Sequence, residues 1–105
     1  MRIPNYKIDD RVATLSEFEN YNGTIRGWRK NSDGHYVVWH WNTMILDYDP
    51  YHDRIEELRG DYISQTTSTL VGRILRALPR KPVENYIGEM ADTDRAKQLR
   101  KMARI

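Results

Sequence analysis

The sequence contains no cysteine, which excludes disulfide bonds and metal sites built on thiolates. It also has no apolar run near the roughly 18 residues that a membrane-spanning helix requires. The first residues have no apolar stretch behind their positive charges, so we expect no signal peptide. These absences are compatible with a reducing cytoplasm, and we expect no membrane partner.

Sequence signatures of catalysis are absent as well. The chain has no Walker loop, no Gly-x-Ser-x-Gly motif and no Gly-x-Gly-x-x-Gly motif. We therefore expect a protein that is not an enzyme and has no catalytic residues, no cofactor and no metal.

The size and the charge distribution suggest one small, polarised domain. The 105 residues match a single domain with a modest core. Residues 1–62 carry 8 Lys or Arg and 11 Asp or Glu, a formal charge of −3, whereas residues 63–105 carry 9 and 4, a formal charge of +5. This division indicates either an acidic front and a basic back or ordinary variation among solvated side chains.

A β-hairpin is the clearest local pattern. Residues 23–30 and 36–41 read as two strands, and the Asn-Ser-Asp-Gly turn at 31–34 joins them because Gly34 accepts a positive φ. A bulge or tight bend at Asn42-Thr43 leads into a strand at 44–48, and a turn at 49–53 leads into a short strand at 54–58. Residues 1–12 read as an extended arm or edge strand, and residues 14–20 as a short helix.

The aromatic strand at 36–41 is apolar on both faces. Alternation places Val37, Trp39 and Trp41 on one face and Tyr36 and Val38 on the other. We expect Trp39 and Trp41 to belong to the core of a small domain. The alternative is an exposed stacking platform for nucleic acid, with basic neighbours on the partner strand.

Helical patterns dominate the second half of the chain. Residues 67–78 form an amphipathic helix that Thr66 or Thr67 can cap, and Pro79 ends it. Residues 80–82 read as a linker, residues 83–90 as a helical turn or two, and residues 94–103 as a final helix capped by Asp92 or Thr93. The apolar stripe of the main helix consists of Leu70, Val71, Ile74, Leu75 and Leu78.

These elements predict an α+β fold: a small antiparallel sheet of three to five strands packed against one main helix, with a C-terminal helical extension. The expected division is a compact domain at 1–79 and a basic helical extension at 80–105. Because the apolar stripe of the last helix is thin, the extension can dock, swap between copies or stay mobile.

Basic side chains on the helices are the best candidates for a functional surface. They attract either an acidic protein partner or the phosphates of a nucleic acid, and a homo-oligomer is possible too. Trp28 and Tyr36 are assigned to the core less firmly than Trp39 and Trp41, so they are candidate binding residues too. The full set of candidates is Arg73, Arg76, Arg80, Lys81, Lys97, Arg100, Lys101, Arg104, Trp28 and Tyr36.

Three further clusters have a plain structural interpretation. His35 and His40 point to opposite faces of one strand, so no pair of metal ligands is expected. The acidic turn, which contains Asp47, Asp49, His52 and Asp53, reads as a solvated turn, and a hydrolase site there is the third functional alternative. The hydroxyl residues at 66–69 suit helix capping better than anion binding.

Four short elements occur in a fixed order: Gly27-Trp28, Val38-Trp39-His40, Trp41-Asn42-Thr43-Met44-Ile45 and Thr66-Thr67-Ser68. This order, over about residues 22–79, resembles a group of small uncharacterised proteins encoded by tailed bacteriophages. The group has no assigned activity, so the resemblance transfers no catalytic residue. It implies a phage origin and the host bacterial cytoplasm as the working compartment. Our main hypothesis is a non-enzymatic accessory protein that binds a host or phage protein; the alternative is a nucleic-acid-binding protein.

Overall fold

The computed structural model describes residues 2–59 and 65–104, and the side chains from residue 68 onward in the second range. Within these ranges the elements are β1 (Arg2–Ile3), η1 (Asn5–Lys7, a 3-10 helix), α1 (Ile8–Ala13), β2 (Phe18–Asn20), β3 (Ile25–Arg29), β4 (Tyr36–His40), β5 (Thr43–Asp49), β6 (Arg54–Leu58), α2 (Gln65–Ala77), α3 (Arg80–Gly88) and α4 (Asp94–Ala103).

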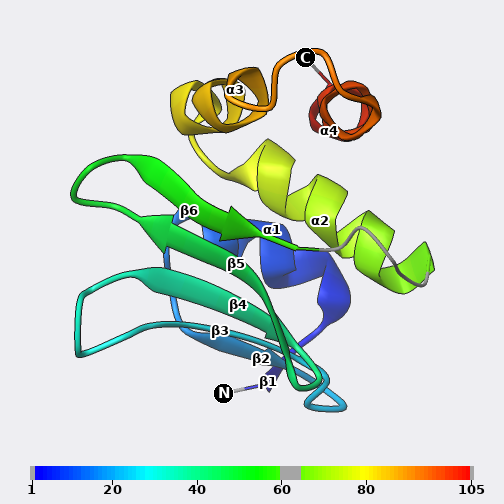
Figure 1. The fold of residues 1–105 in the computed structure, drawn as a ribbon. Helices are drawn as coiled ribbons and strands as arrows, with labels where there is room; N and C mark the ends of the chain where they lie inside the picture. The colour runs from blue at the N-terminus through cyan, green and yellow to red at the C-terminus, as the bar shows by residue number, and fades with distance from the viewer. Residues whose placement is uncertain (1, 60–64, 105) are drawn as a thin grey trace.

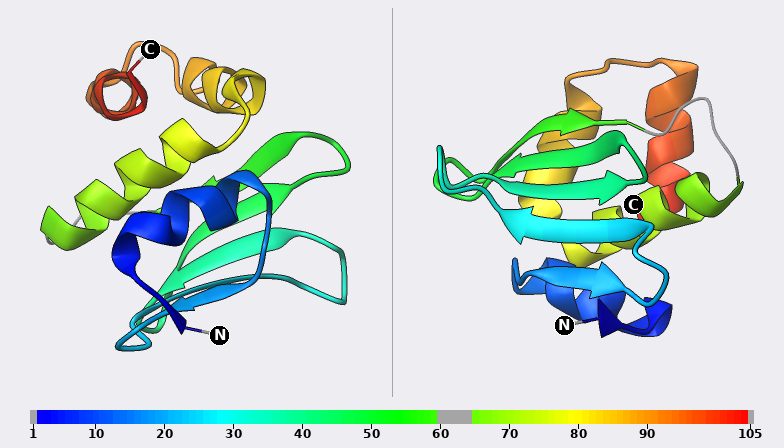
Figure 2. Two further views of the ribbon diagram at one scale, coloured as in Figure 1. Left: turned by 180° about the vertical axis from the view of Figure 1, so that it is seen from behind. Right: turned by 90° about the horizontal axis from the view of Figure 1, so that it is seen from below.

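In the described part of the chain, one sheet of six strands follows the sequence order from β1 to β6. β1 pairs with β2 in parallel, and every later pair is antiparallel. α1 and α2 lie against one face of this sheet, α3 packs beside β6, and α4 packs on α2 (Figure 1). No described helix covers the opposite face, which Figure 2 shows on its right-hand side.

The predicted fold class needs correction, although the protein is α+β. We expected three to five antiparallel strands and one main helix, whereas the described residues form a six-stranded mixed sheet and four α-helices. The additional strand is β2, where the predicted helix at 14–20 is wrong. The predicted arm or edge strand at 1–12 contains β1, but its remainder forms η1 and α1. Phe18 and Asn20 are buried while Glu19 between them is half-exposed, a period of two that belongs to a strand.

Asn20 shows why this segment is extended. Its Oδ1 accepts a hydrogen bond from the backbone N–H of Ile25 at 3.0 Å, and its Nδ2 donates to Asn5 Oδ1 and Thr24 Oγ1 at 3.2 and 3.0 Å. The buried amide is therefore satisfied only when β2 lies beside β3 and η1. Tertiary contacts outweigh the local preference for a capped helix.

The core lies between the sheet and the helices. The predicted stripe of α2 is confirmed, because its five apolar residues are all buried against the sheet and the other helices. The β3–β4 hairpin was also predicted correctly. The bend after β4, which was predicted at Asn42-Thr43, lies at Trp41 and Asn42 instead, and Trp41 has a φ of 56°. The predicted caps Thr66 and Thr67 have side chains outside the described set.

The C-terminal segment docks on the rest of the chain. The same core cluster that includes the sheet also contains Val83, Ile87, Ala96 and Leu99. Of the three alternatives for this segment, which were docking, swapping between copies and mobility, the structure therefore shows docking. The predicted linker at 80–82 is instead the first turn of α3. The cap of α4 is Thr93, whose Oγ1 accepts a hydrogen bond from Ala96 N at 3.1 Å.

Among the described residues, no helix has both the length and the apolar character that crossing a membrane requires.

Candidate functional site on the uncovered face of the sheet

The register of the strands determines which side chains share the uncovered face. Arg26 lies opposite Trp39, and Trp28 lies opposite Val37. On the next strand, Asp47 lies opposite Val37. Because cross-strand partners point to the same side of a sheet, these five residues occupy one face. The partners Gly27, Val38 and Leu46 occupy the other face and belong to the interior.

Two tryptophans stack on each other in the middle of this face. The rings of Trp28 and Trp39 lie 6.2 Å apart between centroids, at an interplanar angle of 16°. The Arg26 guanidinium lies 5.5 Å from the Trp28 ring centroid, in the range of a cation–π contact. Both indoles are half-exposed. Val37 has no exposed surface yet does not belong to the main core, so it is covered from this open side.

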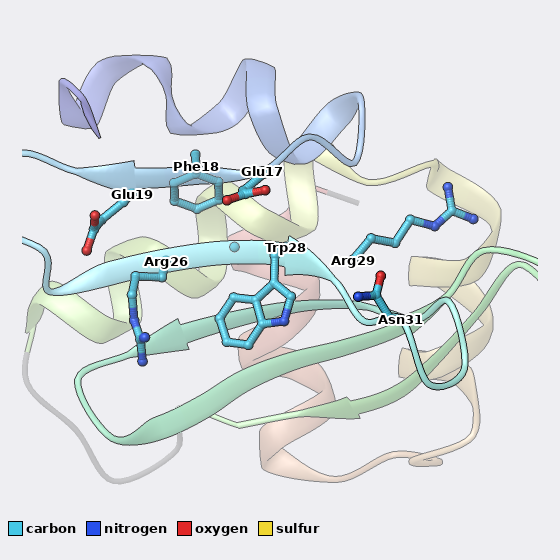
Figure 3. A pocket seen from close by; sticks show the side chains of 8 residues that line it. Glu17, Phe18, Glu19, Arg26, Trp28, Arg29 and Asn31 are labelled. Carbon is cyan, nitrogen blue, oxygen red and sulfur yellow. The ribbon is translucent and has the colours of Figure 1, made fainter. Parts of the chain in front are cut away.

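An open hollow of about 500 Å³ adjoins the tryptophan pair. Strands β2 and β3 form it, and Figure 3 shows the Arg26 and Trp28 side chains on the same side of β3. Glu19 is paired with Arg2 at 3.4 Å. The residues that line the hollow are Glu17, Phe18, Glu19, Arg26, Gly27, Trp28, Arg29 and Asn31.

The charges around this face are mixed, with acidic groups at both sides. Glu17 and Glu19 lie at the β2 side, and Asp47 and Glu57 lie opposite each other on β5 and β6. Arg59 pairs with Glu57 at 2.6 Å. A polyanion would therefore meet carboxylates on both sides of the aromatic pair, which disfavours a nucleic-acid strand on this surface.

A cluster of histidine and aspartate side chains occupies one end of the sheet. His35 Nδ1 lies 2.8 Å from Asp47 Oδ1, and His52 Nδ1 lies 2.6 Å from Asp49 Oδ2. Burial would raise the pKa of Asp49, but hydrogen bonds from the His52 ring and from the backbone of His52 and Tyr51 outweigh it, so the pKa is lowered. Within the described residues, the His35 ring lies against Asp47 and Asp49, and the His52 ring lies against Asp49.

Asp53, the fourth residue of the predicted acidic turn, belongs to the same end of the sheet. Its Oδ1 accepts a hydrogen bond from the Tyr48 hydroxyl. Burial and this bond raise the pKa of Tyr48 above its ordinary value. Within residues 2–59 and 65–104, no group of three or more His, Cys, Asp or Glu side chains has an arrangement that could hold a metal ion.

The predicted basic residues of α2 are mostly engaged inside the protein. Arg73 Nε lies 2.6 Å from Asp9 Oδ1, and a second guanidinium nitrogen donates to the Asn5 carbonyl. Arg76 Nη1 donates to the Met102 carbonyl at 2.6 Å, which joins α2 to α4. Arg73 and Arg76 therefore hold elements together and do not form a free cationic stripe.

The remaining basic residues point outward from α3 and α4. Arg80 is exposed and pairs with Glu84 at 3.2 Å. Arg100 is half-exposed. The four others are exposed and make no ion pair with the described residues; they are Lys81, Lys97, Lys101 and Arg104.

The aromatic predictions require two corrections. Tyr36 was a candidate contact residue, but it has no exposed surface, and its hydroxyl donates to the Ser16 carbonyl at 2.8 Å. Burial raises the pKa of this hydroxyl far above its usual value. Trp39 and Trp41 were expected in the core, yet Trp39 lies half-exposed on the open face and Trp41 is 66% exposed in a turn. Trp28 does lie on the surface that we describe.

Sequence reasoning named Trp39 and Arg26 only in its stacking-platform alternative and favoured the core for Trp39, and it missed the neighbouring glutamates. The available signal was the alternation in residues 25–29, which places Arg26 and Trp28 on one face. The register between β3 and β4, which brings Trp39 beside them, was not available. Sequence reasoning also missed that His35 lies beside Asp47 and Asp49, because the pairing of β4 with β5 brings these residues together.

Comparisons with family models, curated proteins and solved structures found no match for this chain.

Proposed function

We propose that this chain is a non-enzymatic binding protein that engages another protein through the uncovered face of its sheet. The observation that carries the proposal is the stacked pair of Trp28 and Trp39, with Arg26 beside it, on a face that no described helix covers. Tryptophan and arginine are enriched among the residues that contribute most to protein interfaces. The proposed setting, a bacterial cytoplasm during phage infection, rests on the sequence resemblance alone.

A nucleic-acid-binding function is the second candidate, and one observation supports it. Lys97 and Lys101 lie four residues apart on the exposed side of α4, and the exposed Arg104 follows at its C-terminal end, where phosphate contacts are feasible. Two arginines that this hypothesis first relied upon, Arg73 and Arg76, are engaged within the protein. The open face therefore supports protein binding better than the helices support nucleic-acid binding.

The test compares two double variants with the wild type in pull-downs from bacterial lysate, with and without nuclease. Arg26→Ala with Trp28→Ala alters the open face, and Lys97→Ala with Lys101→Ala alters the helical face. We expect a specific protein that survives nuclease and is retained by the lysine variant but lost by the tryptophan variant. Loss of one such tryptophan should weaken a purified complex about 30-fold, which corresponds to roughly 2 kcal/mol.

The opposite pattern would replace the proposal with the second candidate. In that case the captured material would be sensitive to nuclease, would depend on Lys97 and Lys101, and would dissociate steeply as salt is raised. Thermal unfolding of both variants serves as the control for folding, since neither pair belongs to the hydrophobic core.

A further inference from the structure

The His35 imidazole lies among three carboxylates. Its Nδ1 is 2.8 Å from Asp47 Oδ1 and 3.8 Å from Asp33 Oδ2, and its Nε2 is 3.6 Å from Asp49 Oδ2. A neutral imidazole has one N–H donor and one lone pair, so it would turn a lone pair toward one of these carboxylates. Only the imidazolium ion presents a proton to both sides.

Asp33 lies in one turn of the chain and Asp49 is the last residue of β5, where another turn begins, whereas Asp47 lies within β5. Asp33 lies in the turn between β3 and β4, and it accepts a hydrogen bond from the His35 backbone N–H at 2.9 Å. Asp49 organises the turn between β5 and β6, since its Oδ1 accepts from the backbone N–H groups of Tyr51 and His52 at 2.9 and 3.3 Å. His35 therefore connects the two turns through charge.

Close packing joins the same two turns. A Cβ atom on Gly34 would lie 2.5 Å from Tyr51 Cε2, so the Tyr51 ring lies directly against the glycine. Gly34 has a φ of 77°, which glycine adopts at little cost because it has no Cβ atom. The Arg29 guanidinium lies 5.4 Å from the Tyr51 ring centroid, and its Nε donates to the Gly34 carbonyl at 3.0 Å.

We propose that His35 is a proton-dependent clamp that holds the β3–β4 turn and the β5–β6 turn together at one end of the uncovered face. In its protonated form, His35 bridges Asp47 on one side and Asp49 on the other. When His35 loses its proton, the like charges of these carboxylates remain without the cation between them, and the two turns separate. The inference does not depend on the proposed function, because it concerns the protein alone.

The charged groups around His35 are of both signs. Asp33 also pairs with Lys30 at 3.1 Å, and Asp49 also bonds to His52. On β6, Glu57 lies opposite Asp47 and Arg54 lies opposite Asp49, and Arg54 also lies 3.5 Å from Glu56. Asp53, in the β5–β6 turn, bonds to the Tyr48 hydroxyl.

The pKa of His35 agrees with this geometry. Burial lowers it, but the hydrogen bond to Asp47 and the charges of Asp47, Asp33 and Asp49 outweigh burial, so the pKa lies above the ordinary histidine value. A group whose pKa is raised by folding contributes stability at low pH, and this contribution is lost as pH rises through the folded value. His40, whose pKa is lowered by burial, provides an internal contrast at the other end of β4.

The test is an NMR titration of the full chain between about pH 5 and 9, which spans the ordinary histidine range. Imidazole nitrogen signals give the midpoint of each histidine, and hydrogen exchange gives protection factors for the Gly34 and Tyr51 amides. We expect His35 to titrate above about 6.5, and we expect protection of both amides to be lost with the same midpoint. A His35 midpoint at or below that value, or protection that is independent of the His35 midpoint, would overturn the clamp.

Two glutamine variants separate His35 from the other histidine of the cluster. In His52→Gln, which changes an exposed side chain that bonds to Asp49, the pH-dependent loss of protection should persist. In His35→Gln, which cannot carry the charge, the amides should show low protection at every pH. Retention of the wild-type transition in His35→Gln would assign it to another group and refute the proposal. If His35→Gln does not fold, the wild-type titration and His52→Gln still decide.

Discussion

Gly27 is a position where one added methyl group should strongly reduce the stability of the fold. It lies in β3, where a Cβ atom would be 2.3 Å from Phe18 Cε1, 2.9 Å from Phe18 Cδ1 and 2.8 Å from the Tyr36 hydroxyl oxygen. Real Cβ atoms essentially never approach so closely. Phe18 and Tyr36 are both buried, so neither ring can move into solvent without disturbing the core.

Three contributions determine the expected cost of Gly27→Ala. Overpacking of a filled core costs about 1–3 kcal/mol. Displacement of the Tyr36 hydroxyl weakens its hydrogen bond to the Ser16 carbonyl, which is worth about 1 kcal/mol. Alanine is better than glycine in a strand by about 0.5–1 kcal/mol, which offsets part of the loss. We expect a net loss of roughly 2 kcal/mol, which lowers the melting temperature by about 9 °C in a chain of 105 residues.

Thermal unfolding of Gly27→Ala beside Gly88→Ala tests this reasoning. Gly88 ends α3, and nothing lies within 4 Å of an added Cβ there. The control should therefore be neutral or gain up to about 1 kcal/mol from helix propensity. The double variant Phe18→Leu with Gly27→Ala should be less destabilised than the two single effects predict, because the smaller side chain relieves the clash. A wild-type melting temperature for Gly27→Ala would show that β3 and Phe18 are not in contact as described.

Three further predictions concern other parts of the core and the acidic cluster. Leu75→Ala should lower the free energy of unfolding by about 2–5 kcal/mol because Leu75 is buried. Trp39→Ala should lower it clearly less in chemical denaturation, because Trp39 is half-exposed. Equal losses for the two variants would contradict the place of Trp39 on the open face. Tyr36→Phe should cost about 1–3 kcal/mol by leaving the Ser16 carbonyl without its partner, and an unchanged melting temperature would refute that bond. The pKa of Asp49 is lowered by folding, so its carboxylate stabilises the folded state above about pH 4 and this stabilisation is lost on acidification. Wild type should therefore lose more stability than Asp49→Asn as pH falls. Parallel curves of stability against pH for the two proteins would refute this prediction.

Local chemistry explains which elements the sequence predicts correctly. The β3–β4 hairpin depends on the turn at 31–34, where Gly34 takes a positive φ and Asp33 bonds to the backbone of His35. The stripe of α2 and the Thr93 cap of α4 are likewise properties of neighbouring residues. Such signals act within a few positions of the chain, so they can be read without the fold.

The errors occur where distant residues decide the outcome. Residues 14–20 contain good helix caps and acidic residues, but burial of Phe18 and the Asn20 hydrogen bonds makes part of them a strand. The aromatic strand is apolar on both sides, so alternation alone does not say which face becomes the core. The helices dock on the Tyr36 side, which leaves Trp39 on the open face.

The sequence by itself determined that the chain folds as an α+β domain with no disulfide, with a central hairpin and with an amphipathic helix, because composition, turn chemistry and periodicity are local. Only the tertiary structure decided the candidate site. Strand register placed Arg26 and Trp28 beside Trp39 and brought His35 to Asp47 and Asp49. These contacts join residues 11–14 positions apart in the chain, and their geometry depends on how strands pair and which face the helices cover.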